Sequence, residues 1–172
     1  MENLAKIKLL MMDVDGVLTD GSIIVNADGR ETKSFNVLDG HGIRLWHRAG
    51  LKTAIISGRE SEPTKIRAEQ LEIEYVLENC HHKLPACEKL LDDLGLLPEN
   101  AAYIGDDLPD LPVMRYVGFG VAVANAIEPL KEYADYVTNR GGGDGAVREL
   151  IELILKKTGK WQALMENYLP DA

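Results

Sequence analysis

The sequence predicts an α/β fold, a doubly wound and mainly parallel sheet with helices on both faces. Three observations predict it: short apolar segments alternate with segments of helical pattern, the apolar segments are nearly uncharged throughout, and glycines follow several of the helical segments. Continuous apolar strands are typical of parallel sheets, which are buried on both faces. The alternation covers most of the chain, so we expect one domain over residues 1–172.

Five apolar segments are the expected strands. Each has the length of a buried strand, at residues 7–12, 53–56, 74–77, 101–104 and 120–124. Helices are expected between and after them, at residues 42–49, 63–71, 84–94, 110–116, 126–133 and 145–157. Gly50 and Gly95 stand where a C-cap glycine ends a helix.

One segment departs from this alternation, between the first strand and the first helix. Residues 22–25 and 32–35 have strand composition, and Asp28-Gly29 between them is a hairpin-turn signal. We therefore expect an inserted β-hairpin over about residues 21–36. Its apolar strand at 22–25 needs cover from another surface.

Two further segments lie toward the C-terminus. The glycine-rich cluster at residues 141–145 is expected to be a loop before the last helix. The tail, about residues 158–172, carries Trp161, Leu164 and Tyr168 at roughly helical spacing. We expect this tail to pack on another surface, such as that of a neighbouring subunit.

Composition limits the possible classes of function. The formal net charge is −9, from 19 Lys+Arg and 28 Asp+Glu, which argues against binding to nucleic acid or an anionic membrane. No apolar run approaches the length of a bilayer span, and residues 7–12 are too short for a secretory signal. Cys80 and Cys87 lie outside CxxC spacing and indicate reduced thiols in a cytoplasmic protein.

Acidic residues follow the first expected strand. Asp13 and Asp15 are two residues apart, so on an extended backbone their carboxylates point to one side. In an open parallel sheet, ligands bind beyond the carboxyl ends of the strands. A divalent cation would relieve the repulsion between the two carboxylates, and Mg²⁺ suits such oxygen ligands. The alternative is a pair of loop acids that cap the next element.

A second acidic cluster follows the strand at 101–104. Asp106 and Asp107 come directly after it, with Asp110 three residues further on. Capping of the next helix explains Asp107 or Asp110 but not the whole cluster. Two acidic clusters at carboxyl strand ends of one sheet can share a metal ion.

Polar residues also follow two other strands. Ser57-Gly58-Arg59 comes after the strand at 53–56, where a hydroxyl and free backbone N–H groups can bind phosphate. Lys83 begins the helix after the strand at 74–77. Without other information, the first motif is equally typical of a turn with an N-cap, and Lys83 is typical of a surface lysine.

The order of these motifs, DxD, then S-G-R, then K, then GDDxxD, resembles the haloacid dehalogenase superfamily. The resemblance extends from about Lys8 to Asp110 and implies a Rossmann-like fold. It also implies a role for each matching residue. Asp13 would be a nucleophile that forms an aspartyl phosphate, and Asp15 the general acid and then the general base. Ser57 and Lys83 would hold the phosphoryl oxygens.

The same resemblance implies a metal site. Asp106 would bind Mg²⁺ together with Asp13 and the backbone carbonyl of Asp15, while Asp107 and Asp110 would orient the site. An acid at position 15 suits hydrolysis of a phosphoryl intermediate, whereas a dehalogenase would not need it. For substrate binding, Gly58 and Ser57 belong to the phosphate site.

Spacing narrows the resemblance to members without a cap domain. Between Asp15 and Ser57 lie 41 residues, used up by the hairpin and one helix, and 25 lie between Ser57 and Lys83. The whole chain, with DVDGVLTDG, AIISGRE, AYIGDDLPDLP and GGGDGAVRE, looks like the family of phosphatases of 3-deoxy-D-manno-octulosonate 8-phosphate, an intermediate of lipopolysaccharide synthesis. That family implies a homotetramer assembled through the hairpins, with active sites completed by a neighbouring subunit.

Alternatives remain at the level of substrate and of class. A phosphatase of 2-keto-3-deoxynonulosonate 9-phosphate shares the scaffold, although Arg59 resembles the octulosonate enzymes. Arg59 or Arg67 can pair with a sugar-acid carboxylate, and Arg67 is equally typical of a solvated helix face. His81-His82 is a departure from the family pattern and is interpreted as loop.

Two non-catalytic classes are also considered. A receiver-like module is disfavoured because Lys83 precedes Asp106 and Asp107, the reverse of the receiver order. An idle oligomerisation domain is disfavoured because the acidic, serine and lysine motifs all remain.

Overall fold

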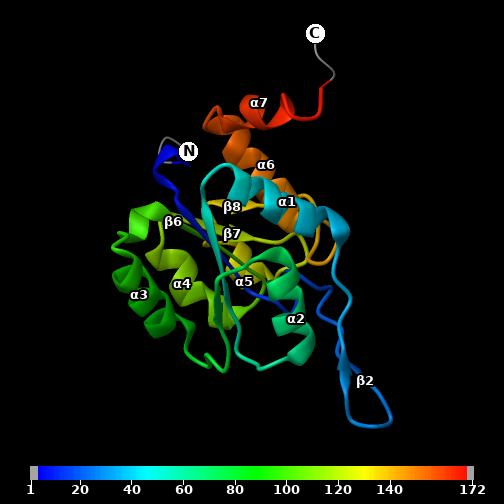
Figure 1. The fold of residues 1–172 in the computed structure, drawn as a ribbon. Coiled ribbons are helices and arrows are strands. Elements are labelled where there is room, and N and C mark those ends of the chain that lie inside the picture. Colours follow the sequence, from blue (N-terminus) through cyan, green and yellow to red (C-terminus); the bar gives the residue numbers. More distant parts are fainter. Residues whose placement is uncertain (1–3, 170–172) are drawn as a thin grey trace.

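The computed structural model describes residues 4–169 and contains a main sheet of six parallel strands in the order β5-β4-β1-β6-β7-β8 (Figure 1). The strands are β1 (Leu9–Met12), β4 (Lys52–Ile56), β5 (Tyr75–Leu77), β6 (Ala101–Gly105), β7 (Phe119–Ala122) and β8 (Tyr136–Val137). The prediction of an α/β fold with a mainly parallel sheet is therefore confirmed. All four residues of β1 are buried, and β1 lies between β4 and β6 in the middle of the sheet.

Each of the five expected strands forms within two residues of its expected ends, whereas β8 was not expected. Its two residues are too few to produce a strand pattern, and the strand exists because it extends the sheet beside β7. From β1 the chain continues to β4 and β5 on one side, and it then returns to β6 on the other side of β1. The direction in which strands are added therefore reverses at β1. Such a switch in strand order opens a crevice at the carboxyl ends of the strands.

Helices cover both faces of the sheet. They are α1 (Val37–Arg48), α2 (Glu62–Leu71), α3 (Lys83–Leu94), α4 (Leu111–Tyr116), α5 (Glu128–Lys131), α6 (Ala146–Lys157) and α7 (Lys160–Met165), with 3₁₀ turns η1 (Leu4–Lys6), η2 (Pro98–Asn100) and η3 (Leu108–Asp110). Helix α1 packs against α6 on one face, and α3 packs against α4 on the other (Figure 1). Within residues 4–169 the hairpin is the only insertion between β1 and α1, so the expectation of no cap domain holds.

Helix α1 begins five residues before its expected start at residue 42. Asn36 caps it, because its side-chain oxygen accepts a hydrogen bond from Leu38 N at 2.8 Å. Gly40 lies inside the first part of the helix, where glycine is unfavourable, so the sequence pattern does not indicate the early start. In the structure a Cβ at Gly42 would lie only 3.2 Å from the Arg148 backbone of α6, so close helix packing requires the glycine.

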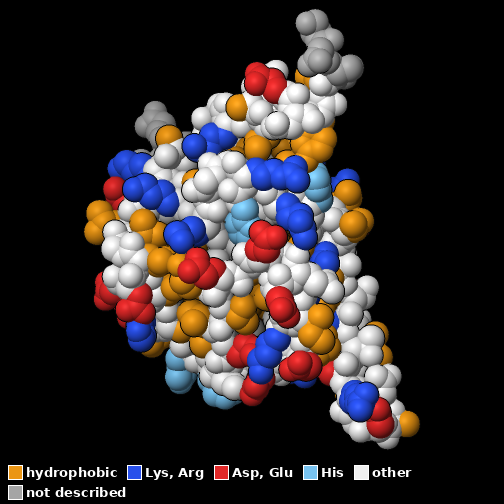
Figure 2. Space-filling view, viewed as in Figure 1, with side chains coloured by type: hydrophobic (Ala, Val, Ile, Leu, Met, Phe, Trp, Pro, Cys, Tyr) orange, Lys and Arg blue, Asp and Glu red, His pale blue; other side chains and the backbone are white. Residues whose placement is uncertain are grey.

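The predicted hairpin is present but shorter than expected. Its strands β2 (Ile24–Val25) and β3 (Glu31–Thr32) pair antiparallel as a separate sheet, which projects from the body in Figure 1. Pairing stops at Thr32 because the chain then turns back toward the main sheet, where Phe35 packs against the core. On the hairpin, Ile23, Ile24 and Val25 are exposed, and hydrophobic side chains appear on the surface of the projecting segment in Figure 2.

The tail packs on its own chain. In α7, Leu164 is buried, and beyond the helix the Tyr168 hydroxyl accepts a hydrogen bond from Arg48 of α1 at 2.5 Å. The last tail residues, 170–172, lie outside the described residues. None of the helices formed by residues 4–169 combines the length and the apolar character needed to cross a membrane.

Candidate active site

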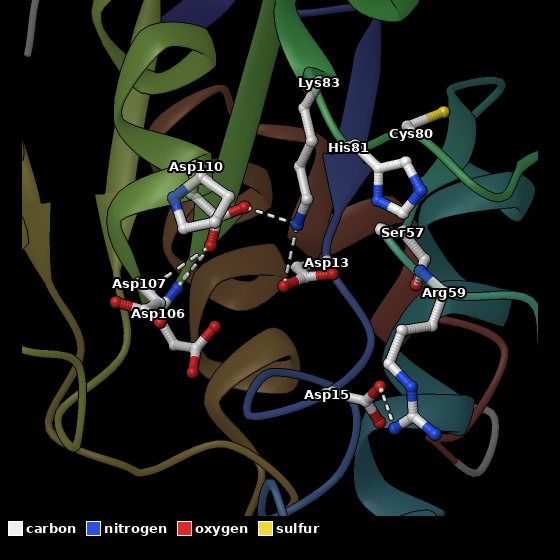
Figure 3. Close-up of a pocket in the computed structure, with 12 residues that line it drawn as sticks. Asp13, Asp15, Ser57, Arg59, Cys80, His81, Lys83, Asp106, Asp107 and Asp110 are labelled. Carbon is white, nitrogen blue, oxygen red and sulfur yellow. Dashed lines mark hydrogen bonds and ion pairs between the residues drawn. The ribbon is translucent and has the colours of Figure 1, made fainter.

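A pocket of about 360 Å³ opens at the carboxyl ends of β1, β4 and β6 (Figure 3). Its lining consists of Asp13, Asp15, Ser57, Gly58, Arg59, Cys80, His81, Lys83, Asp106, Asp107, Pro109 and Asp110. The structure therefore brings together every site residue expected from the sequence except Arg67. This follows from the topology, because parallel strands end at one edge of the sheet.

Asp13 is the first residue after β1, and its surroundings fix it. Its backbone N–H donates to Ile104 O at 3.1 Å, which continues the pairing of β1 with β6. Its Oδ1 accepts from Val14 N at 2.7 Å, and its Oδ2 lies 2.8 Å from the Lys83 amine. The carboxylate is thus held in one orientation at the floor of the pocket, nearly buried.

The loop that follows Asp13, residues 13–20 (the β1 loop), is supported from behind by the glycine-rich loop 141–145. Gly143 N donates to Val17 O at 3.0 Å, and Asn36 Nδ2 donates to Gly143 O at 3.1 Å. At Gly142 a Cβ would collide with the backbone of Gly16, so the two loops meet backbone to backbone. The glycine-rich loop therefore shapes the pocket without being among its lining residues.

Asp110 organises the buried side of the pocket through four hydrogen bonds. Its Oδ1 accepts from the Lys83 amine and from the Tyr103 hydroxyl, both at 2.6 Å. Its Oδ2 accepts from the backbone N–H groups of Asp106 at 2.9 Å and Asp107 at 3.2 Å. Both carboxylate oxygens are thus occupied, and the side chain fixes the β6 end instead of facing a ligand.

The carboxylates and the lysine of the pocket perturb each other. Burial and the neighbouring Asp110 carboxylate raise the pKa of Asp13 to about 6, although Lys83 opposes the rise. Burial and the Asp13 and Asp110 carboxylates raise the pKa of Asp106 to about 7. Burial alone would lower the pKa of Lys83, but Asp13 and Asp110 outweigh it and raise it. The pocket thus holds more negative charge than one lysine neutralises.

The donor set fits a hard divalent cation. Carboxylate oxygens of Asp13, Asp106 and Asp110 all lie within 4.8 Å of one another. Since Asp110 already accepts four hydrogen bonds, Asp13 and Asp106 are the carboxylates free to bind a metal ion. The Asp106 carboxylate lies directly against Gly16, where a Cβ would collide with it, so it closes on the β1 loop.

Ser57 and Arg59 form the opposite wall, at the end of β4. Ser57 is buried. Its backbone N–H donates to Leu77 O at 2.8 Å, and its carbonyl accepts from Cys80 N at 2.9 Å. Its hydroxyl accepts from Arg59 N at 3.2 Å and faces the pocket. The guanidinium of Arg59 lies at the mouth, 3.4 Å from Asp15 Oδ2 (Figure 3).

Two residues at the hairpin base that the sequence analysis missed contact side chains of this pocket without lining it themselves. The Lys33 amine pairs with the Asp15 carboxylate, and Glu31 binds Arg59 Nη2 at 2.8 Å. A signal existed: on an extended segment Lys33 faces the same side as Phe35, so a lysine stands at an inward-facing position. An inward lysine indicates a buried carboxylate partner.

Arg67, His81 and Asp107 have less direct positions. Helix α2 turns Arg67 away from the pocket, into a separate groove beside α1, where it bonds Gln70 Oε1 at 3.2 Å. Within one chain Arg67 therefore does not reach the site expected for it. His81 is exposed at the pocket rim. Asp107 lines the pocket and also caps η3, since its Oδ1 accepts from Leu108 N at 2.7 Å.

The chain is similar to proteins of one family. A family model described as haloacid dehalogenase-like hydrolase matches residues 67–150. The 3-deoxy-D-manno-octulosonate 8-phosphate phosphatase of Escherichia coli strain K12 is 48% identical over 154 residues, which cover 90% of this chain and 82% of that protein.

Two solved structures are similar over nearly the whole chain. The crystal structure of 3-deoxy-D-manno-octulosonate 8-phosphate phosphatase from Moraxella catarrhalis in complex with magnesium, phosphate and KDO has a TM-score of 0.96 at 43% identity, covering 98% of this chain and 97% of that one. The cobalt-bound phosphatase from Haemophilus influenzae has a TM-score of 0.89 at 40% identity, covering 92% of each chain.

Proposed function

Because this chain belongs to the haloacid dehalogenase-like hydrolases, in the family of the 3-deoxy-D-manno-octulosonate 8-phosphate phosphatases, we propose that it hydrolyses 3-deoxy-D-manno-octulosonate 8-phosphate to the free sugar acid and inorganic phosphate. The single observation that carries the proposal is the Asp13 carboxylate, 2.8 Å from the buried Lys83 amine in a pocket shared with Asp15 and Asp106. A nucleophile, a cation and further acids at one strand end suit phosphoryl transfer.

Asp13 is the proposed nucleophile. One of its carboxylate oxygens bonds to phosphorus while the ester bond to the sugar oxygen breaks, and the leaving oxygen takes a proton from Asp15. Water then attacks the aspartyl phosphate, Asp15 takes its proton, and phosphate leaves as Asp13 is restored. Hydrogen bonding of Asp13 Oδ1 to Val14 N supports this role, because it fixes the line of attack.

Mg²⁺ is the cofactor, and Asp13, Asp106 and the backbone carbonyl of Asp15 are the proposed ligands. The raised pKa values of Asp13 and Asp106 support this set, because burial and neighbouring carboxylates destabilise their ionised forms more than Lys83 alone stabilises them. When bound, the metal neutralises these carboxylates and the charge of the phosphoryl oxygens. Lys83 and Ser57 hold the phosphoryl group from the other side.

Substrate recognition is proposed for the Ser57-Gly58-Arg59 turn. Gly58 lines the pocket beside Ser57 and leaves the backbone accessible to phosphate oxygens. Arg59 stands at the mouth with its side chain 44% exposed, so a sugar-acid carboxylate can reach it.

The experiment is phosphate release from a panel of 2-keto sugar-acid phosphates, with and without Mg²⁺. We expect hydrolysis of the eight-carbon 8-phosphate with Mg²⁺, loss after chelation, and loss in Asp13→Asn. The matched control is Asp93→Asn, the same change on the exposed side of α3. Failure to hydrolyse any member of the panel, or full activity of Asp13→Asn, would overturn the mechanism. Preference for the nine-carbon 9-phosphate would overturn only the substrate.

We also propose a homotetramer assembled through the hairpins, with a neighbouring subunit completing each pocket. Exposed Ile23, Ile24 and Val25 on a projecting hairpin support it, because such apolar strands need cover. Light scattering of the native protein and of Ile24→Asp tests it. The substitution should lower the mass and keep the fold, whereas a native monomer would exclude the assembly.

Two further proposals concern the domain organisation and the cellular location. One buried cluster extends through the described residues, which supports a single domain, and calorimetry should show one unfolding transition. The free thiols Cys80 and Cys87 support a cytoplasmic location, which fractionation of cells making the protein would test.

A further inference from the structure

The base of the hairpin holds a closed ring of four charged side chains. Lys33 pairs with the Asp15 carboxylate and lies 3.7 Å from Glu31 Oε1. Arg59 lies 2.8 Å from the same Glu31 oxygen and 3.4 Å from Asp15 Oδ2. Acids and bases therefore alternate around the ring, and each cation contacts both acids.

Within this ring, Lys33 is the member withdrawn from solvent. Its side chain is 1% exposed, against 16% for Glu31 and 23% for Asp15. A buried ammonium group is stable only with close acidic partners, so the amine is confined to the position between the two carboxylates. Arg59, by contrast, has a side chain that is 44% exposed at the mouth of the pocket.

The ring determines where the Asp15 side chain points. Lys33 contacts Oδ1 and Arg59 contacts Oδ2, so both oxygens are engaged by cations from two different segments. Figure 3 shows the carboxylate beside Arg59 and apart from Asp13 and Lys83. The backbone of Asp15 belongs to the β1 loop, but its side chain is held by the hairpin base and by the end of β4.

Glu31 anchors the ring to the body of the protein. Its second oxygen, Oε2, accepts a hydrogen bond from the Ser61 hydroxyl at 2.7 Å, at the start of α2. The two hairpin residues thus form a link from α2, through Glu31 and Lys33, to Asp15. Neither Glu31 nor Lys33 is among the residues that line the pocket with Asp13, Ser57 and Lys83.

We propose that Lys33 is a positioning residue for Asp15, and that Glu31 in turn positions Lys33. This inference rests on the proposed function, in which Asp15 gives a proton to the leaving sugar oxygen. For that step Arg59 turns from Oδ2 to the substrate carboxylate, Oδ2 carries the proton, and Lys33 keeps its hydrogen bond to Oδ1. A general acid acts only within hydrogen-bond reach of that oxygen, so a side chain free to rotate would spend little time in place. The hairpin therefore serves the chemistry of its own chain in addition to any contact with a neighbour.

The test compares two leaving groups in Lys33→Met. A sugar hydroxyl needs a proton as it leaves, whereas p-nitrophenolate leaves as a stable anion. Since kcat/KM reports the steps up to formation of the aspartyl phosphate, it isolates this difference. We expect kcat/KM for the sugar-acid phosphate to fall about 10- to 100-fold, up to the lower end of the about 10²- to 10⁴-fold that acid–base catalysis contributes, because Asp15 itself remains. With p-nitrophenyl phosphate, kcat/KM should stay near the wild-type value.

Three controls separate positioning from other roles. Lys33→Arg keeps a cation and should recover most of the lost kcat/KM. Lys65→Met removes a lysine of α2 whose partners are Glu60 and Glu78, and it should leave both substrates unaffected. A loss seen only in KM would indicate contact with the substrate carboxylate and would overturn the proposal.

An equal loss with both leaving groups would also overturn it, because a structural role lowers both. If Lys33→Met does not fold, Glu31→Gln keeps the lysine and removes part of its support. In Glu31→Gln, kcat/KM should again fall for the sugar-acid phosphate and not for p-nitrophenyl phosphate, but by a smaller factor. The proposed function fails separately, if the wild-type chain hydrolyses p-nitrophenyl phosphate but no sugar-acid phosphate.

Discussion

Lys83 and Lys33 are two buried lysines, each between two carboxylates, in two different regions. Lys83 belongs to the sheet end, where its partners Asp13 and Asp110 are themselves buried. Lys33 belongs to the hairpin base, where Asp15 and Glu31 retain contact with solvent. The same arrangement of charges is therefore desolvated in one region and partly hydrated in the other.

The difference predicts how each region responds to the loss of a charged side chain. At the sheet end, removing one charge leaves another buried without a partner, so the geometry there is strongly enforced. At the hairpin base, water can solvate a carboxylate that loses its partner. We expect a lost charge to cost more stability at the sheet end than at the hairpin base, and the following measurements test that contrast.

The largest effect should come from Lys83→Met. In the metal-free protein at pH 8 it leaves Asp13 and Asp110 buried without a cation, so the free energy of unfolding should fall by about 3–5 kcal/mol. Lys33→Met should lower it by about 1 kcal/mol or less, because its carboxylates stay hydrated. Urea denaturation of both variants measures the difference. Equal losses would show that the two regions do not differ in this way.

The next effect is the pH dependence of stabilisation by Mg²⁺. Protons compete with the metal for Asp13, with a pKa of about 6, and for Asp106, with a pKa of about 7. The increase in Tm caused by Mg²⁺ should therefore be small at pH 5 and large at pH 8. At 100 times Kd it corresponds to about 2.7 kcal/mol.

The metal-free protein should behave in the opposite way. A carboxyl whose pKa is raised by folding binds a proton that the unfolded chain releases, so stability falls as pH rises from about 4 through 7. Lys33→Met should keep both trends if they belong to the sheet end alone. If the increase in Tm caused by Mg²⁺ disappeared in Lys33→Met, the sheet end and the hairpin base would be coupled.

A smaller effect is expected for Asp106→Asn. The substitution removes one of the crowded carboxylates, so the metal-free protein at pH 8 should gain about 2–4 °C in Tm, equivalent to about 1 kcal/mol. Mg²⁺ should then add little, because a ligand is lost. Thermal melts with and without Mg²⁺ measure both changes, and a loss of Tm in the metal-free variant would contradict the account of charge crowding.

The smallest effect should come from Tyr103→Phe. The change removes one of the four donors to Asp110 and leaves Lys83 and two backbone N–H groups in place. Stability should fall by about 1 kcal/mol, and Asp110 should stay in position. A much greater loss would mean that the Tyr103 hydroxyl, and not the lysine, holds the buried carboxylate.

Much of the fold and most of the pocket could be predicted from the sequence. Apolar strands such as β1 predict a parallel sheet, and the carboxyl ends of parallel strands bring Asp13, Ser57 and Asp106 to one edge whatever the details of packing. Residues directly after strands are therefore the ones that sequence reasoning places best.

Positions that depend on helix rotation or on hairpin length were not predictable. Arg67 faces α1 because Thr64, Ala68 and Leu71 of the same helix are buried, and that rotation follows from packing. The alternation with Phe35 indicates that Lys33 faces inward, but the identity of its partners depends on where the hairpin ends, which the sequence pattern does not give. The start of α1 was missed because its glycines disfavour a helix in isolation.

The backbone contact between the glycine-rich loop and the β1 loop has a consequence for hydrogen exchange. The amide of Gly143 donates to Val17 O, and that of Gly142 donates to Asn125 Oδ1 at 2.7 Å. The Gly143 amide cannot exchange with solvent deuterium while the β1 loop stays closed against it, whereas the Gly142 amide depends on Asn125. The exchange rate of Gly143 therefore reports how often the segment carrying Asp13 opens, from a position outside the pocket lining.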